Sequence, residues 1–312
     1  MPFTVDFHHH ILPDFYRRAS EIGGASVGGV PPAPWSPASA LGFLDDAGID
    51  VVVTSISAPG VHFGDDAEAR ELARRCNELA AEMVRDRPDR FAAFAVLPLP
   101  DVDGALAELE YSLDTLGMDG VVLLSNAGGV YLGDHRFDPV FAELQRRQAL
   151  VFVHPTASPD PSAHIPGVPD TLLDFVTDTS RAITRMHYSG TFARTPDVKY
   201  VISHAGGTIP YLANRFAIVD EMGVVDGIEQ RGTAADLFRR LYWDTALSWS
   251  KPVLTTLLDV AGPDRIVFGS DFPYLRRDLA VDCVRKVNDV LAEDVLGNNA
   301  RVLLPRFEKD LR

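Results

Sequence analysis

Histidine and aspartate residues stand where several short apolar segments of the sequence end. His8 and His10 end the segment VDFHHH, His154 ends VFVH, and Asp271 follows VFGS. If these segments are parallel strands of a barrel, their carboxyl ends meet at one rim, and residues distant in the chain converge there. Three neutral imidazoles and one carboxylate suit Zn²⁺, or Mn²⁺ in an expanded coordination shell. The sequence therefore predicts one divalent metal ion, with zinc as the first expectation and manganese as the alternative.

The spacing of the first two histidines supports a shared site. His8 and His10 are two positions apart, which in an extended strand places both on one face, while His9 points to the other side. A single histidine at a strand end is more often a hydrogen-bonded polar residue than a ligand. The chain has only nine histidines, however, and ligand-type residues at four strand ends favour a common metal site.

His204 ends a further apolar segment. Ala205, Gly206 and Gly207 follow it, and the two glycines let the backbone approach a ligand closely. His204 can be a fifth ligand or a general acid/base beside the metal. We favour the second role, because four ligands already fill the protein's share of the coordination shell.

Short β-branched segments alternate along the chain with longer segments of helical periodicity. We predict eight strands, at Phe3–Phe7, Asp50–Ser57, Phe91–Leu97, Gly120–Leu124, Leu150–Val153, Lys199–Ser203, Leu241–Asp244 and Arg265–Gly269. The helical segments include Asp66–Asp86, Val102–Leu116, Asp138–Arg147, Ile209–Met222, Lys251–Ala261 and Asp278–Leu291. Buried strands that alternate with helices pair in parallel, because parallel strands need a crossover between them.

Eight such units close a barrel. We therefore predict an α/β fold, a (β/α)₈ TIM barrel that forms a single domain over residues 1–312, with the mononuclear metal site at its carboxyl-terminal rim. An open doubly wound sheet is the alternative, but the G-x-G-x-x-G that such a fold uses for phosphate is missing after the first strand.

Two long segments rich in glycine and proline follow predicted strands. The first is an insertion at about residues 11–37, with a small helix at Pro13–Ile22 and the loop Gly23–Pro37; the second is Thr156–Pro169. Loops in this position form the active face of a barrel, so we expect them to build a lid or a substrate wall, with exposed decoration as the alternative. Trp35, Trp249 and Tyr274 also lie in strand-to-helix loops, where they can bind an aromatic substrate or simply pack.

The composition excludes several functions. A net charge of −15 without a basic patch argues against nucleic acid and against anionic membrane surfaces. No apolar segment approaches the length of a membrane span, and the amino terminus lacks the pattern of a signal peptide, so a cytoplasmic protein is expected. Cys76 and Cys283 lie in helical segments and are expected to be buried thiols.

The order of these residues resembles the amidohydrolase superfamily, which carries H-x-H after the first strand, histidines after the fifth and sixth, and aspartate after the eighth. The strings HHHILP, HAGGTIPYLANR, YWDTA and FGSDFPY are similar to its decarboxylase branch, which acts on aminocarboxymuconate semialdehyde, 6-methylsalicylate, resorcylate and carboxyvanillate. Binuclear members of the superfamily bridge two ions with a carboxylated lysine at the end of strand 4. The predicted strand 4 ends Leu123-Leu124-Ser125, so the resemblance implies a mononuclear site.

The same resemblance implies a homodimer. Arg215 matches an arginine that reaches the substrate carboxylate of a neighbouring subunit, which would place the helix Ile209–Met222 at the interface. An exposed helix arginine is the alternative. Asp244 in YWDTA can line the floor of the site, although capping the next helix or supporting the fold is the favoured role.

Three functions remain open. The first is metal-dependent, non-oxidative decarboxylation of a small aromatic or unsaturated hydroxy- or amino-carboxylic acid, in which His204 or Asp271 handles the proton. The second is hydrolysis of an amide or lactone, in which the ion lowers the pKa of a water and His204 accepts its proton. The third is a binding or scaffold protein with a structural metal, which the open site and the glycines beside His204 disfavour.

Overall fold

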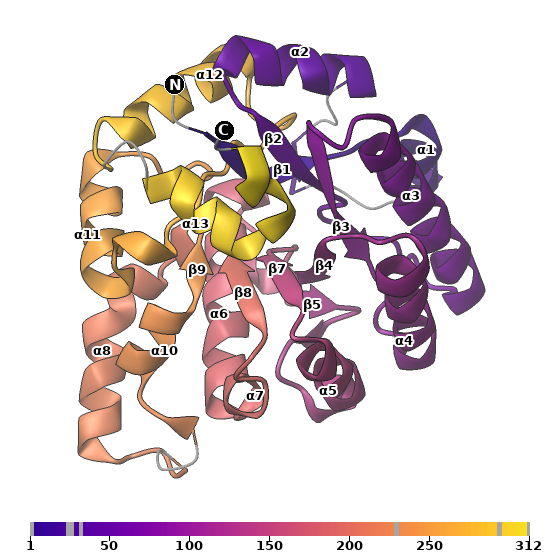
Figure 1. Cartoon of the computed structure of the whole chain (residues 1–312). Helices are drawn as coiled ribbons and strands as arrows, with labels where there is room; N and C mark the ends of the chain where they lie inside the picture. Colours follow the sequence, from indigo (N-terminus) through magenta and orange to yellow (C-terminus); the bar gives the residue numbers. More distant parts are fainter. Residues whose placement is uncertain (1–2, 23–27, 31–33, 228–230, 292–294, 311–312) are drawn as a thin grey trace.

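The structure, a computed structural model, describes residues 3–22, 28–30, 34–227, 231–291 and 295–310 (Figure 1). Its centre is a curled parallel sheet of seven strands in the order β1-β2-β3-β4-β7-β8-β9. The strands are β1 (Val5–His10), β2 (Val51–Ser55), β3 (Phe91–Val96), β4 (Gly120–Leu124), β7 (Leu150–His154), β8 (Lys199–Ile202) and β9 (Tyr242–Trp243). A small antiparallel pair, β5 (Asn126–Ala127) and β6 (Val130–Tyr131), follows β4.

The eighth predicted strand, Arg265–Gly269, differs from the prediction. It is not a regular strand but makes isolated parallel bridges to both edges of the sheet, between Trp243 and Ile266 and between Asp6 and Phe268. The backbone N–H of Phe7 donates to the carbonyl of Phe268 at 2.9 Å, and that of Val267 donates to Trp243 at 2.9 Å. The segment after Arg265 therefore joins β9 to β1, although it is too short to pair as a full strand.

Helices surround the sheet, as Figure 1 shows. They are α1 (Asp14–Ile22), α2 (Pro37–Ala47), α3 (Asp66–Asp86), α4 (Val102–Glu110), α5 (Asp138–Arg147), α6 (Asp174–Tyr188), α7 (Thr191–Arg194), α8 (Ile209–Met222), α10 (Ala234–Arg240), α11 (Lys251–Ala261), α12 (Arg277–Asn288) and α13 (Val295–Leu303). Four predicted helices, those that became α3, α5, α8 and α11, have the predicted bounds. The segment predicted as one helix to Leu116 instead changes into a π-helix, η1 (Tyr111–Thr115).

The hydrophobic core lies between the sheet and these helices. Every residue of β1, β2 and β3 is buried, because such strands have neighbours on both faces. Large side chains that are fully enclosed, among them Phe7, Phe94, Phe152 and Trp243, come from the strands themselves. The polar residues at the strand ends are therefore held by a rigid, close-packed support.

The two segments predicted to cover the active face differ in how much of each the structure describes. In the first, the helix α1 is present, but residues 23–27 and 31–33 lie outside the described part of the chain. The second, Thr156–Pro169, contains one short 3₁₀ turn, η3 (Pro161–Ala163), and a further turn after it, η4 (Asp170–Leu172), leads into α6. Among the described residues, no helix is both long and apolar enough to span a bilayer.

Candidate metal centre

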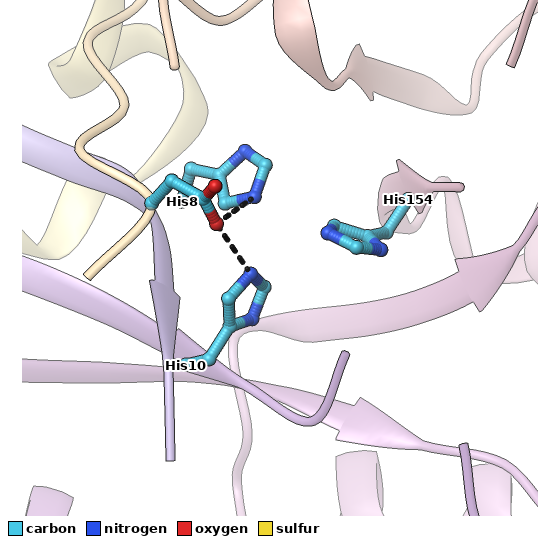
Figure 2. Close-up of side chains that lie close together, drawn as sticks. His8, His10 and His154 are labelled. Atoms are coloured by element: carbon cyan, nitrogen blue, oxygen red, sulfur yellow. Dashed lines mark ion pairs between the residues drawn. The ribbon is translucent and has the colours of Figure 1, made fainter. Parts of the chain in front are cut away.

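His8, His10, His154 and Asp271 meet at one point, as the sequence predicts. Each offers one ligand atom, and these four atoms all lie within 4.8 Å of one another. Nε2 of His8 and Nε2 of His10 approach Oδ1 of Asp271 at 3.3 and 3.4 Å, while the ring of His154 lies across from them (Figure 2). The four residues come from the ends of β1 and β7 and from the segment that follows Arg265.

The outer nitrogen of each histidine is already engaged. Nδ1 of His8 lies 2.6 Å from Oδ2 of Asp244, Nδ1 of His154 lies 2.7 Å from the carbonyl of Pro155, and Nδ1 of His10 lies 3.0 Å from Oγ of Ser55. Carboxylate and carbonyl oxygens can only accept here, so Nδ1 of His8 and of His154 donates a proton. A neutral ring then has its lone pair on Nε2, the atom directed at the cluster.

These residues fit a divalent cation. Nε2 of His8 and of His10 are buried and have no hydrogen-bond partner in the described structure, since the approach to Asp271 does not reach hydrogen-bond geometry. Unsatisfied buried polar atoms are costly and rare in folded proteins. A cation placed among three Nε2 atoms and a carboxylate would satisfy all of them, and the donor set matches zinc or manganese.

The pKa values of the four residues show which of them would carry a proton that a metal ion must displace. Burial disfavours a charged His8, but Asp244 and Asp271 outweigh it and raise the pKa of His8 to about 10. Burial lowers the pKa of His10 to about 4 and, together with the neighbouring imidazoles, holds the pKa of His154 well below its ordinary value. Burial alone would raise the pKa of Asp271, but the rings of His10 and His8 hold it well below the usual range. Two ligands are thus ready as neutral imidazoles, and His8 must lose a proton.

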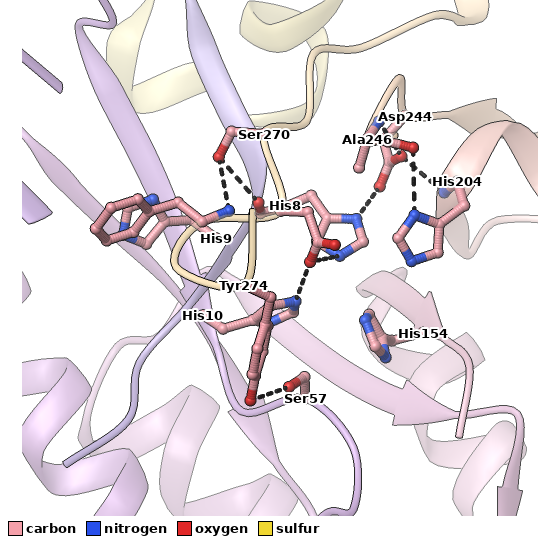
Figure 3. A network of polar contacts seen from close by, with 12 residues as sticks. His8, His9, His10, Ser57, His154, His204, Asp244, Ala246, Ser270 and Tyr274 are labelled. Atoms are coloured by element: carbon pink, nitrogen blue, oxygen red, sulfur yellow. Dashed lines mark hydrogen bonds and ion pairs between the residues drawn. The ribbon is translucent and has the colours of Figure 1, made fainter. Parts of the chain in front are cut away.

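His204 lies beside the four candidate ligand residues rather than among them. Its ring centroid is 4.6 Å from that of His8 and 5.7 Å from that of His154. Nδ1 of His204 donates to the carbonyl of Ala246 at 3.2 Å, which leaves Nε2 free, and burial lowers the pKa of His204 (Figure 3). It is therefore a neutral imidazole able to accept a proton.

Asp244 connects His204 to the ligands, a role that the sequence analysis did not favour. While Oδ2 of Asp244 faces His8, Oδ1 accepts hydrogen bonds from the backbone N–H of His204 at 2.8 Å and of Ala246 at 3.0 Å. The carboxylate is fully buried at the end of β9. A carboxylate at the end of a predicted barrel strand was the signal that could have identified it.

Asp6 likewise uses its carboxylate to accept backbone hydrogen bonds, in this case where β1 meets the segment that contains Ser270. Its Oδ1 accepts from the backbone N–H of His8 and of Ser270, both at 3.0 Å, and its Oδ2 accepts from Oγ of Ser270 at 2.6 Å. This carboxylate therefore fixes the backbone beside two expected ligands, His8 and Asp271. Asp271 itself has φ 61°, in the left-handed region that a non-glycine residue adopts only when its surroundings hold it there.

A cavity of about 250 Å³ opens above the cluster. His154, His204 and Asp271 line it, as does Tyr274, whose hydroxyl accepts a hydrogen bond from Oγ of Ser57 at 3.2 Å (Figure 3). The rest of the lining is mainly apolar, with Val30, Leu172, Phe175, Val176 and Leu247. The cavity can therefore hold a small, largely apolar molecule against the metal ligands.

The other predicted substrate-binding residues lie elsewhere. Trp35 and Trp249 are half-buried and pack against the core without lining this cavity, and Lys286 stands over the ring of Trp249. Arg215 is exposed on α8. Within this single chain, Tyr274 alone of the four predicted substrate-binding residues lines the cavity that the described residues form.

Comparison with known proteins places this chain in a family. The amidohydrolase family model matches residues 5–306. The chain is 35% identical to a 6-methylsalicylic acid decarboxylase of Aspergillus aculeatus over 322 residues, which covers 98% of this chain and 97% of the other.

Two solved structures show the same fold. A protein described as amidohydrolase II superposes with a TM-score of 0.85 at 28% identity and covers 96% of this chain and 99% of its own. A 5-carboxyvanillate decarboxylase of Novosphingobium aromaticivorans, solved with manganese and 4-hydroxy-3-methoxy-5-nitrobenzoic acid, superposes with a TM-score of 0.84 at 23% identity and covers 97% of this chain and 96% of its own. The chain therefore belongs to the amidohydrolase family, and its resemblance to the decarboxylase branch of that family is confirmed.

Proposed function

We propose that this protein is a divalent-metal-dependent decarboxylase that releases CO₂ from a small aromatic hydroxy acid. The observation that carries the proposal is the meeting of three imidazoles and Asp271 beneath a mainly apolar cavity, with the neutral His204 beside them. The similarity to a 6-methylsalicylic acid decarboxylase over nearly the whole length of both chains supports the same reaction class.

His8, His10, His154 and Asp271 would hold the metal ion. When bound, the ion supplies a positive charge and Lewis acidity that can hold the substrate carboxylate and an adjacent oxygen. Both zinc and manganese suit the donor set, and a relative of the same fold was solved with manganese. Elemental analysis of the protein purified without added metal distinguishes the two.

The chain's own residues have two tasks. The apolar wall, which includes Phe175, Val176 and Leu247, seats the ring and excludes water. When the bond between the ring and the carboxylate breaks, its electron pair remains on the ring carbon, and that carbon must receive one proton. Nε2 of His204 and the carboxyl group of Asp271 are the groups placed to hold and deliver this proton, because both line the cavity.

The charge of the cavity supports a substrate with a single carboxylate. Within the described structure, neither lysine nor arginine lines the cavity. A second carboxylate on the substrate would lie against apolar side chains or neutral hydroxyls such as those of Tyr274 and Ser248, and no described residue of the same chain supplies a cation there to balance it. We therefore infer a monocarboxylic acid whose remaining substituents are hydroxyl or alkyl groups.

We further propose that the protein is a homodimer with α8 in the interface. This helix carries exposed apolar side chains, with Tyr211 exposed to 85%, Met222 to 66% and Ile218 to 45%. Apolar residues gathered on one exposed helix favour a protein contact. Arg215 lies on the same helix and would reach a neighbouring subunit. Sedimentation equilibrium tests the dimer, and a monomer at assay concentration would contradict it.

The reaction is tested by measuring CO₂ release from a panel of salicylate-type acids, alongside opening of aryl lactones by the same preparation. We expect CO₂ from at least one acid, loss of this activity after chelation, and recovery when Mn²⁺ or Zn²⁺ is returned. Lactone opening without CO₂ from any acid would instead identify a hydrolase.

A further inference from the structure

A second group of ligand-type side chains lies at the edge of the catalytic cavity, in the segment between β7 and α6. It consists of His164, Asp170 and Asp174. One ligand atom of each residue lies within 4.8 Å of the ligand atoms of the other two. None of the three belongs to the cluster formed by His8, His10, His154 and Asp271.

Two members of this group already contact each other. Nδ1 of His164 lies 2.8 Å from Oδ1 of Asp170, and the two side chains are 37% and 15% exposed. An exposed pair of this kind contributes little by itself. The pair does, however, place an imidazole and a carboxylate side by side, with water able to reach them.

Asp174 gives a second reason to expect a ligand here, independent of the contact between His164 and Asp170. It is only 7% exposed, yet its carboxylate makes no hydrogen bond or ion pair with any described residue. Its charge faces His164: the hydrogen bond and the charge of Asp170 raise the pKa of His164, and the charge of Asp174 adds to this effect. Its oxygen instead lies within the group, so a cation held by His164 and Asp170 would also neutralise Asp174.

We propose that His164, Asp170 and Asp174 form a second, weaker binding site for a divalent transition-metal ion such as Mn²⁺ or Zn²⁺. One imidazole nitrogen and two carboxylates are suitable donors for these ions, and the exposure of His164 leaves the other coordination positions to water. An imidazole ligand disfavours Mg²⁺ and Ca²⁺, which take oxygen donors.

The position of this site links it to the catalytic cavity. Thr171 and Leu172 lie between Asp170 and Asp174 in the chain, Phe175 follows Asp174, and all three line the cavity. An ion would tie His164 to η4 and to the first turn of α6, and so hold these three residues in one arrangement. The same segment includes Leu172, whose side chain is 72% exposed.

The test is a count of bound ions. The full-length protein, first freed of metal with a chelator, is titrated with Mn²⁺ alone while free Mn²⁺ is followed by electron paramagnetic resonance. We expect two ions per chain, one tight and one weaker. The variants His164→Gln and Asp174→Asn should each lose the weaker ion and keep the tight one.

A matched control is available at His62, whose Nε2 lies 2.8 Å from Oδ1 of Asp66. This is also a partly exposed histidine–aspartate pair, but no third ligand-type residue in the described chain joins it. The variant His62→Gln should therefore still bind two ions. If the wild-type protein binds only one ion, or if His164→Gln and Asp174→Asn both retain two, the proposed site is wrong.

A measurement on the wild-type protein covers the case in which a variant fails to fold. Paramagnetic Mn²⁺ at the second site should broaden the ring resonances of His164 at the same concentration at which the second ion binds. A second ion that leaves these resonances sharp would also overturn the proposal. Because bound ions are counted directly, a negative CO₂ assay would contradict the proposed function and leave this site intact.

Discussion

Oδ2 of Asp244 lies 2.6 Å from Nδ1 of His8, and both residues are fully buried. Carboxylates that hold the outer nitrogen of a metal-binding histidine fix its orientation and make it a better ligand, and their loss typically weakens metal binding 10- to 100-fold. We expect Asp244→Asn to weaken metal binding by about this factor. The asparagine oxygen can still accept from the N–H groups of His204 and Ala246, so its NH₂ group would face Nδ1 of His8, and the substitution removes both the charge and the acceptor beside that ring.

Competition with a chelator measures this affinity, and circular dichroism checks the fold. Asp220→Asn is a suitable control, because Asp220 is a buried, ion-paired aspartate that contacts Arg231 instead of the cluster. Equal metal affinity of Asp244→Asn and wild type would show that the contact is structural only.

His154→Ala should remove the metal ion and the activity together. It deletes one of the three Nε2 donors, and the cavity that it leaves admits water in its place. Metal content is measured by elemental analysis after dialysis, with His62→Gln as the histidine control. A fully occupied His154→Ala protein would exclude this residue as a ligand.

Metal affinity should rise with pH. The pKa of His8, raised to about 10 in the metal-free protein, means that Nε2 carries a proton at neutral pH and that an ion must displace it. Protonation competes below this pKa, so affinity should increase about tenfold per pH unit between pH 6 and 9, with about one proton released for each ion bound. Calorimetry in two buffers of different ionisation enthalpy counts the protons. Release of none would show that His8 is already neutral.

His204→Asn should keep the ion and lose turnover. Asparagine can still donate to the carbonyl of Ala246, but it cannot hold and deliver a proton at neutral pH. A general acid/base contributes about 10²- to 10⁴-fold, and kcat should fall within this range. If the metal content falls as well, His204 is a ligand.

Arg215→Ala tests the proposed contribution of α8. If Arg215 reaches the substrate carboxylate of a neighbouring subunit, KM should rise by about tenfold or more while the metal content stays the same. Arg239→Ala, which removes another exposed helix arginine, should leave KM unchanged. Identical kinetics for the two variants would remove Arg215 from the site.

The sequence predicted the bounds of several helices well. In α3, α5 and α11 the apolar residues recur on one face, whereas α8 ends at Gly223, whose left-handed backbone stops the helix. Helix α6 was not recognised, since its buried face includes Asp178, Thr179, Ser180 and His187, which obscure the apolar stripe. The segment after Arg265 is apolar enough for a strand, but its pairing is limited to bridges, which depends on how the two edges of the curled sheet approach each other and not on local composition.

The candidate site was predictable where each residue stands at a strand end. His8, His10, His154 and Asp271 converge because parallel strands bring their carboxyl ends together. Asp244 also ends a predicted strand, so its place at the rim could be expected, but its contact with His8 could not. The carboxylate faces Nδ1 of His8 only because β9 and β1 lie on opposite sides of the segment after Arg265, which bridges them. The residues that line the cavity likewise depend on how α6 and the loops pack against the curled sheet.

The bridging segment also determines when during synthesis the site can form. His8 and His10 leave the ribosome well before Asp271 and Ser270, because Ser270, which Asp6 binds, stands 264 positions after Asp6. Until the segment with Ser270 emerges, β1 and β9 are open edges, and open edges can pair with other chains. The nascent protein therefore gains its carboxylate ligand and loses its exposed edges in the same late event.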